Sequence, residues 1–332
     1  MSPTRLKILV TRAIPEAAMA LLTPHFDVDY YDKHTAIPRP LLLKKVKDKD
    51  GLLCILTDKV NPELLKKAPK LKAVATYSVG FDHIDVGACT DRGVIVTNTP
   101  GVLTESTADF TWALLLSAAR RVVEGDQFMR AGKYKGWDPM MLLGTDVHGK
   151  TLGVVGFGRI GQAVARRAMG FGMKVLYYDT QRIFPEVERE FGAKYVELDE
   201  LLRQADFVTL HTVYDKSTHH LIGAKAFALM KKSAYLINAA RGPIVDEKAL
   251  VKALKTGRIR GAALDVYERE PLMAPGLARC RNAVLVPHLA SASLETRTKM
   301  GVMAAQGLVD ALALRKKPAH TVNADIFDKI AF

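Results

Sequence analysis

Three ionisable residues in the second half of the chain, Arg241, Glu270 and His288, each follow a short apolar run that indicates a β-strand. Polar residues at the carboxyl ends of parallel strands meet at one edge of a sheet, where ligands bind. An imidazole can give or take a proton near neutral pH, and a neighbouring carboxylate favours its charged form. A planar guanidinium holds carboxylate and carbonyl oxygens in a fixed fork. Together the three residue types indicate proton transfer to a small bound acid.

Each of these residues, taken alone, also has an ordinary structural explanation. Arg241 could be a surface charge beside a helix, Glu270 a solvated loop residue before proline, and His288 a structural histidine. Their meaning therefore depends on the elements that position them and on the motifs around them.

Short β-branched runs alternate with helical periods along nearly the whole chain, which is typical of parallel sheets with helices on both faces. The runs lie at residues 8–10, 52–56, 73–75, 94–96, 152–155, 175–178, 207–210, 235–237, 262–266 and 284–286. Two domains are expected, because 332 residues exceed the size of one hydrophobic core. The pattern predicts an α/β fold with two doubly wound parallel-sheet domains.

Two long helical stretches mark where the chain changes domain. One runs from Thr104 to about Ala131 after a turn signal that contains proline and glycine, and the other covers roughly 293–314. We expect the chain to leave its first domain near residue 100 and to return to it near residue 287. The predicted domains are residues 1–100 plus 287–332 and residues 101–286.

The most specific local motif is Gly156-Phe157-Gly158-Arg159-Ile160-Gly161. An apolar strand runs into it and a helical pattern runs out of it, which is the context of a dinucleotide-binding loop. Gly156 allows the tight turn, Gly158 lets the backbone approach a pyrophosphate, and Gly161 lets helix and strand pack closely. The helix N-terminus offers free N–H groups and a positive dipole end to the phosphates.

Asp179 ends the second strand of this unit, 18 residues beyond Gly161. A carboxylate there can accept hydrogen bonds from the adenosine ribose, and it would repel a 2′-phosphate. The sequence therefore predicts NAD as the preferred cofactor. Arg182 lies close by and leaves NADP as a second cofactor.

The chain resembles the D-isomer-specific 2-hydroxyacid dehydrogenases over almost its full length, in the branch of glyoxylate/hydroxypyruvate reductases and D-glycerate dehydrogenases. The resemblance rests on the segments 77–85, 156–161, 238–246, 264–271 and 287–292. It implies two Rossmann-like domains separated by a cleft, a flavodoxin-like substrate-binding domain at residues 1–100 plus 287–332 and an NAD-binding domain at residues 101–286. It implies the reduction of a small 2-oxo acid, glyoxylate or hydroxypyruvate, to glycolate or D-glycerate. It also implies that Arg241 binds and orients the substrate, and that His288, paired with Glu270, donates the proton.

Further contacts follow from the same resemblance. The implied cofactor contacts, besides Gly156, Gly158, Gly161, Asp179 and Arg241, are Arg159, Ile160, Thr180, Gln181, Arg182, Thr104, Thr212, Val213, Ala239, Ala240 and Asp265. The implied substrate contacts, besides Arg241 and His288, are Leu56, Ser78, Val79, Gly80 and Trp137. Val79 and Gly80 resemble the loop whose backbone N–H groups hold the substrate carboxylate, and Asp265 resembles the acceptor for the nicotinamide amide.

Several of these positions have a plain structural explanation beside the functional one. Thr104 could cap the helix that follows it, and Asp265 could be a solvated strand end. Val79 and Gly80 could form an ordinary turn. Trp137 resembles a residue offered to a neighbouring subunit's pocket, which requires a homodimer, but it could instead pack in its own core.

Two positions depart from the family's pattern. The family commonly has proline two residues after the histidine at 211, where this chain has Thr212-Val213-Tyr214, and the change can alter the adenine edge of the cofactor site. Ala290 stands where glycine is usual, so its methyl group can tighten the substrate pocket.

Other functions remain open on this fold. A D-lactate dehydrogenase or a 2-ketogluconate reductase would use the same chemistry on another 2-oxo acid. A formate dehydrogenase fits less well, because that branch carries glutamine where Glu270 stands. An NAD(H)-sensing, corepressor-like binding protein shares the fold and even the catalytic residues, but no motif-binding extension is seen at either end of this chain.

Composition argues against several classes of protein. The formal net charge is +13, but the basic residues are scattered or lie on helix faces without interleaved aromatic residues, so nucleic-acid binding is not expected. No apolar stretch approaches the length of a membrane span, and the N-terminal run indicates a strand rather than a signal peptide. Cys54, Cys89 and Cys280 are not spaced as metal ligands. We therefore expect reduced cysteines, no metal site and a cytoplasmic protein.

Overall fold

The computed structural model describes residues 5–328, and the chain divides into two compact units. Unit 1 joins the chain up to Leu103 with the segment from Ala292 onward, and unit 2 is Thr104–Ser291. The sequence predicts a return to the first domain near residue 287, which assigns His288 to the substrate-binding part. The structure instead holds His288 in unit 2, because the backbone of residues 288–290 is hydrogen-bonded to Asp265.

Unit 1 is built on a five-stranded sheet whose neighbouring strands are all parallel, in the order β2-β1-β3-β4-β5. The strands are β1 (Leu6–Val10), β2 (Phe26–Tyr30), β3 (Gly51–Cys54), β4 (Ala73–Thr76) and β5 (Ile95–Thr97). The helices are α1 (Glu16–Leu22), α2 (Arg39–Lys45), α3 (Pro62–Lys67), α4 (Val86–Asp91) and α12 (Leu294–Leu308). The strand order is the flavodoxin-like one that the sequence analysis predicts.

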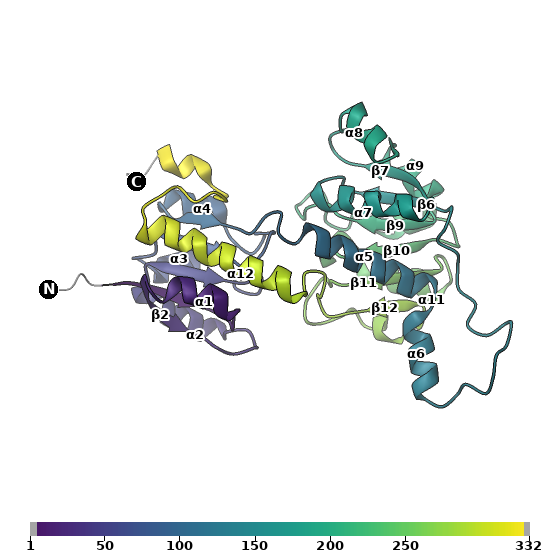
Figure 1. Cartoon of the computed structure of the whole chain (residues 1–332), viewed down its shortest axis with the longest axis horizontal. Coiled ribbons are helices and arrows are strands. Elements are labelled where there is room, and N and C mark those ends of the chain that lie inside the picture. Colours follow the sequence, from purple (N-terminus) through teal and green to yellow (C-terminus); the bar gives the residue numbers. More distant parts are fainter. Residues whose placement is uncertain (1–4, 329–332) are drawn as a thin grey trace. The chain divides into compact units, whose positions relative to one another are not determined.

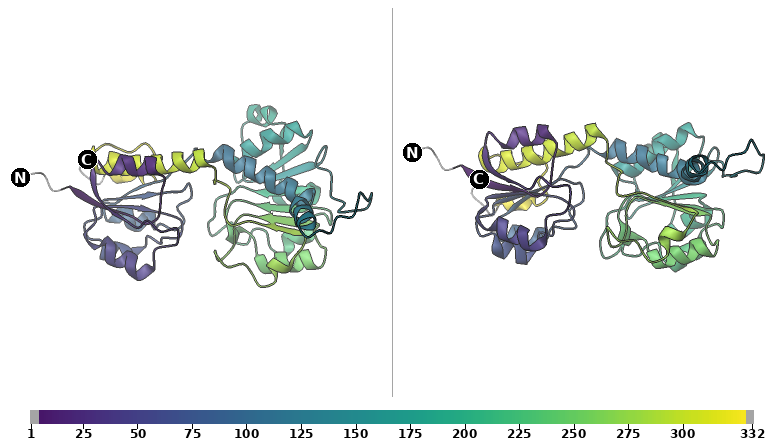
Figure 2. Two further views of the ribbon diagram at one scale, coloured as in Figure 1. Left: turned by 60° about the horizontal axis from the view of Figure 1, so that its bottom comes forward. Right: turned by 90° about the horizontal axis from the view of Figure 1, so that it is seen from below.

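Helices cover both faces of this sheet, which is why its strands are nearly continuous apolar runs. Residues of α1 and α12 pack on one face, and residues of α2, α3 and α4 pack on the other (Figure 1, Figure 2). The central strands β3 and β4 are buried along their whole length. The carboxyl ends of β3 and β4, which carry the expected substrate loop, are thereby fixed to a rigid layer.

Unit 2 has a seven-stranded, all-parallel sheet in the order β12-β11-β10-β9-β6-β7-β8. The strands are β6 (Thr151–Val155), β7 (Lys174–Tyr178), β8 (Ala193–Tyr195), β9 (Phe207–Leu210), β10 (Tyr235–Asn238), β11 (Gly261–Leu264) and β12 (Ala283–Leu285). The helices are α5 (Thr104–Ala119), α6 (Val122–Arg130), α7 (Arg159–Gly170), α8 (Pro185–Glu190), α9 (Leu198–Gln204), α10 (Ala224–Leu229) and α11 (Glu247–Lys255). The order in which the strands are added reverses between β6 and β9, because β7 and β8 extend the sheet on one side of β6 and β9 to β12 extend it on the other. Such a switch point is where doubly wound sheets bind ligands.

The helical stretch expected from Thr104 to Ala131 is two helices rather than one. Arg121 adopts a left-handed conformation with φ of 54°, which a right-handed helix cannot continue, so α5 ends at Ala119 and α6 begins at Val122. Thr104 is the first residue of α5, so it does not occupy the capping position that precedes a helix. The helix expected at 293–314 is α12, followed by a π-helical turn at Val309–Ala313.

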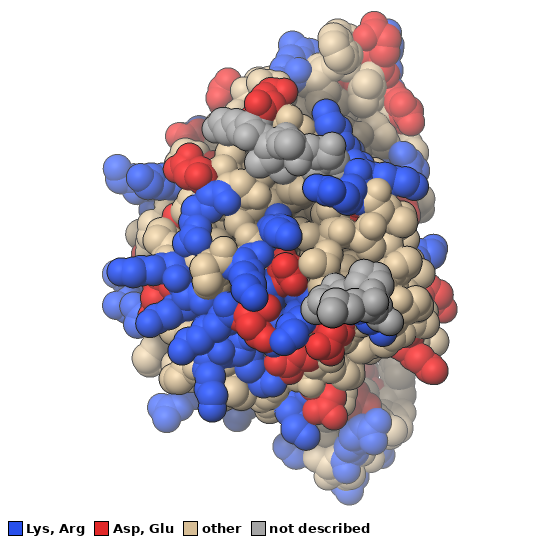
Figure 3. Space-filling view, turned by 90° about the vertical axis from the view of Figure 1, so that its left-hand side faces the viewer, with Lys and Arg blue, Asp and Glu red and all other residues tan. Residues whose placement is uncertain are grey.

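Basic side chains gather on one face of unit 1, with acidic side chains among them (Figure 3). Several of the lysines in this unit are engaged in ion pairs, for example Lys45 with Asp29 at 2.5 Å and Lys49 with Asp48 at 2.6 Å. Such pairing lowers the local excess of positive charge. Among residues 5–328, no helix is both long and apolar enough to cross a bilayer.

Candidate functional site

The three residues expected to do the chemistry follow three adjacent strands of unit 2. Arg241 lies beyond β10, Glu270 beyond β11 and His288 beyond β12, and these strands pair side by side in that order. Because the strands are parallel, their carboxyl ends lie at the same edge of the sheet. The expected constellation is therefore built on one rigid layer within one unit.

His288 and Glu270 are in direct contact. Nδ1 of His288 lies 3.0 Å from Oε2 of Glu270, and Oε1 of Glu270 accepts a hydrogen bond from the Tyr267 backbone N–H at 3.1 Å. A carboxylate next to Nδ1 fixes a proton on that nitrogen and orients the ring, so that Nε2 can exchange a proton with a bound ligand. Both side chains are only partly buried, so the pair remains accessible to a small ligand.

The groups around Glu270 favour its ionised form. Burial alone would raise the pKa of Glu270, but the hydrogen bond and charge of His288, the Tyr267 N–H and the charge of Arg241 together hold it below its ordinary value. Glu270 is therefore ionised at neutral pH. Because folding lowers the pKa of Glu270, the ionised carboxylate stabilises the folded state at pH values above the ordinary carboxyl pKa. This contribution to the free energy of unfolding is lost as the pH falls through the lowered pKa of Glu270.

His288 has an unusual backbone conformation, with φ of 55° in the left-handed region. Asp265 holds it there. The Asp265 carbonyl accepts the His288 N–H at 2.9 Å, and the Asp265 carboxylate accepts the N–H groups of Leu289 at 2.5 Å and Ala290 at 2.9 Å. Three hydrogen bonds from one residue thus fix the turn that presents the imidazole.

Asp265 has a structural part in the site. The residue is fully buried, and both carboxylate oxygens accept backbone N–H groups of the 288–290 turn. Burial raises the pKa of Asp265, although the two N–H groups oppose that effect. Asp265 therefore holds His288 in position, and its role as acceptor for the nicotinamide amide stays a prediction.

Asn238 is a residue of the site that the sequence analysis missed. It ends β10 and is buried, its side-chain oxygen accepts the Ala240 N–H at 3.0 Å, and its amide donates to the Arg241 carbonyl at 2.9 Å. An asparagine at a strand end that bonds its own following backbone is a recognisable turn signal, and this one shapes the loop that carries Arg241.

The loop of Arg241 is also pressed against the loop of Glu270. A Cβ atom on Gly242 would lie 1.9 Å from the Tyr267 carbonyl carbon and 2.4 Å from the Glu268 nitrogen. Only glycine permits this approach, which brings the guanidinium loop and the carboxylate loop together.

The glycine loop between β6 and α7 has the geometry that a dinucleotide needs. Gly156 has φ of 90°, and a Cβ there would lie 2.5 Å from the Thr212 nitrogen. A Cβ on Gly161 would lie 2.2 Å from the Gly156 carbonyl oxygen, so helix and strand are tightly packed. Among the described atoms nothing lies within 4 Å of a Cβ on Gly158, and no side chain caps α7. The open space and the free helix N–H groups fit a pyrophosphate.

Asp179 stands directly beyond β7, beside this loop. Its carboxylate accepts the Phe157 N–H at 2.7 Å and the Thr180 hydroxyl at 3.2 Å, which orients it at the carboxyl edge. Arg182 is turned to Glu188, which it meets with two hydrogen bonds of 2.8 and 2.9 Å. The guanidinium that was expected to accommodate a 2′-phosphate is therefore already engaged.

The expected substrate loop belongs to unit 1. Leu56 follows β3, and Ser78, Val79 and Gly80 follow β4. Within residues 5–328, no group accepts a hydrogen bond from the N–H of Val79 or of Gly80. Two consecutive free N–H groups at a strand end form a ready binding site for a carboxylate.

Known proteins resemble this chain over nearly its full length. Residues 112–290 match the family described as D-isomer specific 2-hydroxyacid dehydrogenase, NAD binding domain. The chain is 49% identical over 324 residues to glyoxylate reductase of Thermococcus litoralis, covering 96% of this chain and 97% of that one, and 50% identical over 322 residues to glyoxylate reductase of Korarchaeum cryptofilum, covering 96% of each. The chain belongs to the D-isomer-specific 2-hydroxyacid dehydrogenase family.

Solved structures agree with this assignment. The NADPH-dependent glyoxylate/hydroxypyruvate reductase of Sinorhizobium meliloti, in complex with NADP and malonate, has a TM-score of 0.86 and 31% identity, covering 99% of this chain and 100% of that one. The expectation of an NAD(P)-dependent oxidoreductase that acts on CH–OH groups is thereby confirmed.

The remaining expected cofactor residues lie beyond strands of unit 2 or at the start of its helices. They are Thr104 in α5, Arg159 and Ile160 in α7, Thr180 and Gln181 beyond β7, Thr212 and Val213 beyond β9, and Ala239 and Ala240 beyond β10. Val213, which stands at the departure from the family's proline, is largely exposed. Ala290 is buried, so its methyl group packs inside unit 2 rather than on an open surface.

Trp137 lies in the long connection between α6 and β6 (Figure 1). Its side chain is 81% exposed, which excludes packing in the core of its own chain. The contact with a neighbouring subunit stays a prediction.

Proposed function

We propose that this protein reduces glyoxylate and hydroxypyruvate to glycolate and D-glycerate, with NADH as the preferred cofactor and NADPH as a second one. The observation that carries the proposal is the contact between His288 and Glu270 beside the loop of Arg241. The names of the curated relatives support the choice of 2-oxo acid.

Each residue has a defined part in the proposed reaction. The bound nicotinamide dinucleotide supplies the hydride, and it would be held by Gly156, Gly158, Gly161 and the α7 N-terminus. His288 gives a proton from Nε2 to the carbonyl oxygen that becomes the new hydroxyl. Glu270 orients the ring and stabilises its positive charge.

Substrate orientation falls to a second group of residues. Arg241 binds the carboxylate and the carbonyl oxygen of the 2-oxo acid in a fixed fork. The N–H groups of Val79 and Gly80 hold the carboxylate, and Leu56 and Ser78 border the same loop region of unit 1. These interactions fix which face of the carbonyl receives the hydride.

The cofactor preference follows from Asp179 and Arg182. The Asp179 carboxylate suits two ribose hydroxyls and repels a phosphate. Arg182 would have to leave its paired contact with Glu188 to bind a 2′-phosphate. We therefore expect NADPH to work less well here than NADH, although the Sinorhizobium meliloti relative is NADPH-dependent.

A substrate panel tests the proposal. The purified protein is assayed for loss of NADH or NADPH absorbance with glyoxylate, hydroxypyruvate, pyruvate and 2-ketogluconate. We expect the highest kcat/KM with glyoxylate or hydroxypyruvate and NADH. A clear preference for pyruvate or 2-ketogluconate would replace the proposed substrate, and NADH binding without turnover of any 2-oxo acid would contradict an enzymatic role.

We further propose that the protein is a homodimer that uses the segment from α6 to Leu143. This segment exposes an unusual number of large apolar side chains, namely Val122, Val123, Met129, Tyr134, Trp137, Met140 and Leu143. Apolar surface of this extent is typical of a subunit interface. Sedimentation should give a dimer for the wild type and a monomer for a variant that carries Trp137→Glu with Met140→Glu. A monomeric wild type would contradict the proposal.

We also propose a cytoplasmic location, which the free thiols support. Cys54, Cys89 and Cys280 are unpaired and buried, as is typical of proteins from a reducing compartment. Recovery of the native protein from an oxidising compartment after cell fractionation would contradict this location.

A further inference from the structure

The loop at Ser78, Val79 and Gly80 has all three of its carbonyl groups engaged by unit 1. The Ser78 carbonyl accepts the Thr99 N–H at 2.9 Å, the Val79 carbonyl accepts the Asn98 side-chain amide at 2.8 Å, and the Gly80 carbonyl accepts the Ser78 hydroxyl at 2.7 Å. A carbonyl that turned toward a bound carboxylate would repel it. The loop therefore directs its acceptors inward, while the N–H groups of Val79 and Gly80 have no acceptor in the described part of the chain.

The hydrogen bond to Gly80 is the last of three successive hydrogen bonds. The Thr76 hydroxyl lies 2.7 Å from the Ser78 hydroxyl, and Nε2 of His83 lies 3.0 Å from the Thr76 hydroxyl. Thr76 and Ser78 are buried, with 0% and 4% of their surface exposed. The chain His83–Thr76–Ser78–Gly80 therefore runs through a low-dielectric interior, where hydrogen bonds polarise one another.

The donor and acceptor of each hydrogen bond in this series follow from the number of protons that each group carries. A hydroxyl group carries one proton, and Ser78 uses its own on the Gly80 carbonyl. Thr76 must then donate to Ser78, and His83 must donate to Thr76 from a protonated Nε2. The Cys54 thiol lies 3.9 Å from the same nitrogen, and burial raises its pKa well above the ordinary value, so it adds no thiolate acceptor there.

We propose that His83, Thr76 and Ser78 form a positioning relay that fixes the Gly80 peptide so that the N–H groups of Val79 and Gly80 bind the substrate carboxylate. The inference rests on the proposed function of that loop. It adds His83 and Thr76 as positioning residues in the interior of unit 1 and gives Ser78, an expected substrate contact, a positioning role through its hydroxyl. Losing one hydroxyl would leave a buried donor and a buried acceptor unpaired and would release the loop.

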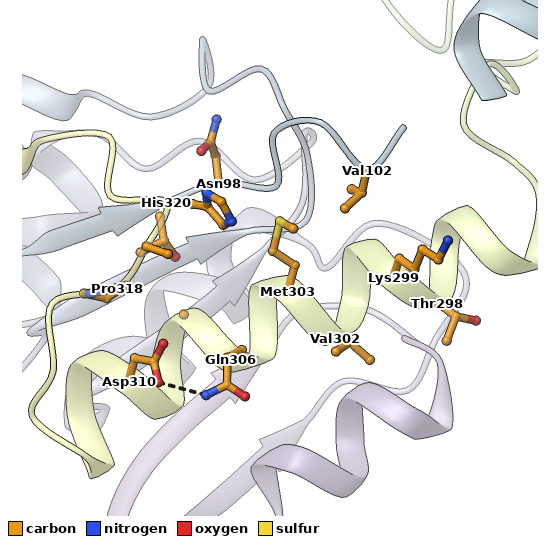
Figure 4. A pocket seen from close by; sticks show the side chains of 13 residues that line it. Asn98, Val102, Thr298, Lys299, Val302, Met303, Gln306, Asp310, Pro318 and His320 are labelled. Carbon is orange, nitrogen blue, oxygen red and sulfur yellow. Dashed lines mark hydrogen bonds between the residues drawn. The ribbon is translucent and has the colours of Figure 1, made fainter. Parts of the chain in front are cut away.

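Asn98 supports the same loop from a different side. It borders a pocket of about 420 Å³ in unit 1, together with residues of α12 and the segment 318–320, and its side chain is drawn at the edge of that pocket (Figure 4). A substitution of Asn98 would change the pocket as well as the loop. Thr76 is fully buried and does not line this pocket, so it gives the cleaner test.

The test compares Thr76→Val with Thr76→Ser. Valine has the shape of threonine without the hydroxyl, whereas serine keeps the hydroxyl and loses a methyl group. We expect Thr76→Val to raise KM for glyoxylate by about tenfold, the effect of one lost hydrogen bond, with kcat within about twofold of the wild type. NADH affinity should be unchanged, because the glycine loop belongs to unit 2. Thr76→Ser should restore KM.

A merely structural role would give a different result. If Thr76→Val lowers the melting temperature but leaves KM for glyoxylate at the wild-type value, the relay is wrong. Should that variant fail to fold, Ser78→Ala against Ser78→Thr gives the same comparison, with the hydroxyl retained only in the threonine variant. Equal KM values for that pair would overturn the proposal.

Nitrogen NMR of histidine-labelled protein tests the relay without any activity. His83 should carry its proton on Nε2, and a neutral ring protonated only on Nδ1 would overturn the relay. Failure of the proposed function looks different, because the wild type would then reduce neither glyoxylate nor hydroxypyruvate whatever the state of His83.

Discussion

Replacing His288 with asparagine is expected to lower kcat for glyoxylate reduction by about 10²- to 10⁴-fold, the usual contribution of a general acid. Asparagine tolerates the left-handed backbone that residue 288 adopts, so the turn held by Asp265 should persist. NADH affinity should stay within about twofold, because the glycine loop and Asp179 are untouched. Steady-state kinetics and NADH fluorescence titration measure the two quantities.

A second histidine provides the control that distinguishes loss of the proton donor from a general effect of a His→Asn substitution. His219 is exposed and lies outside the expected site, so His219→Asn should keep the wild-type kcat. A His288→Asn variant that turns over as fast as His219→Asn would show that the imidazole of His288 is not the proton donor.

Replacing Gly242 with alanine is expected to damage both stability and activity. The added Cβ would lie 1.9 Å from the Tyr267 carbonyl carbon and 2.0 Å from its oxygen, so two backbone segments must separate. Overpacking of this kind destabilises a fold by about 1–3 kcal/mol, occasionally more. Because the two segments carry Arg241 and Glu270, kcat/KM should fall by at least about tenfold. Urea unfolding and steady-state kinetics measure the effects.

Gly170 provides the control for this substitution. It ends α7, and among the described atoms none lies within 4 Å of the position that its Cβ would take. Gly170→Ala should therefore leave activity unchanged and the free energy of unfolding within about 1 kcal/mol of the wild type. If Gly242→Ala also leaves kcat/KM and the free energy of unfolding nearly unchanged, the close approach of the two loops is not needed for activity or stability.

The sequence predicted the parts of this fold that depend on local pattern. Apolar β-branched runs separated by helical periods specify parallel strands, and residues just beyond them come to one sheet edge. That rule was enough to bring Glu270 and His288 together, since β11 and β12 are neighbours. The glycine spacing likewise predicted a tight turn at Gly156 and close packing at Gly161, because both depend on the lack of a Cβ.

What escaped prediction depends on contacts between residues far apart in the chain. The left-handed Arg121 that divides α5 from α6 leaves no mark in the hydrophobic pattern. The sequence also gave no sign that Asp265 would hold the turn after His288, because its partners are backbone groups of residues 289 and 290, 24 and 25 residues away. The hydroxyl chain from His83 to Gly80 depends on which face of β4 each side chain occupies and on the fold of the following loop.

The most direct measurement follows the hydride itself. The enzyme is incubated with glyoxylate and NADH that carries deuterium at both C4 positions, and the glycolate is analysed by mass spectrometry and proton NMR. The account predicts one deuterium on the hydroxyl-bearing carbon for each NADH oxidised. Consumption of NADH that yields glycolate without deuterium, or yields no glycolate, would contradict it.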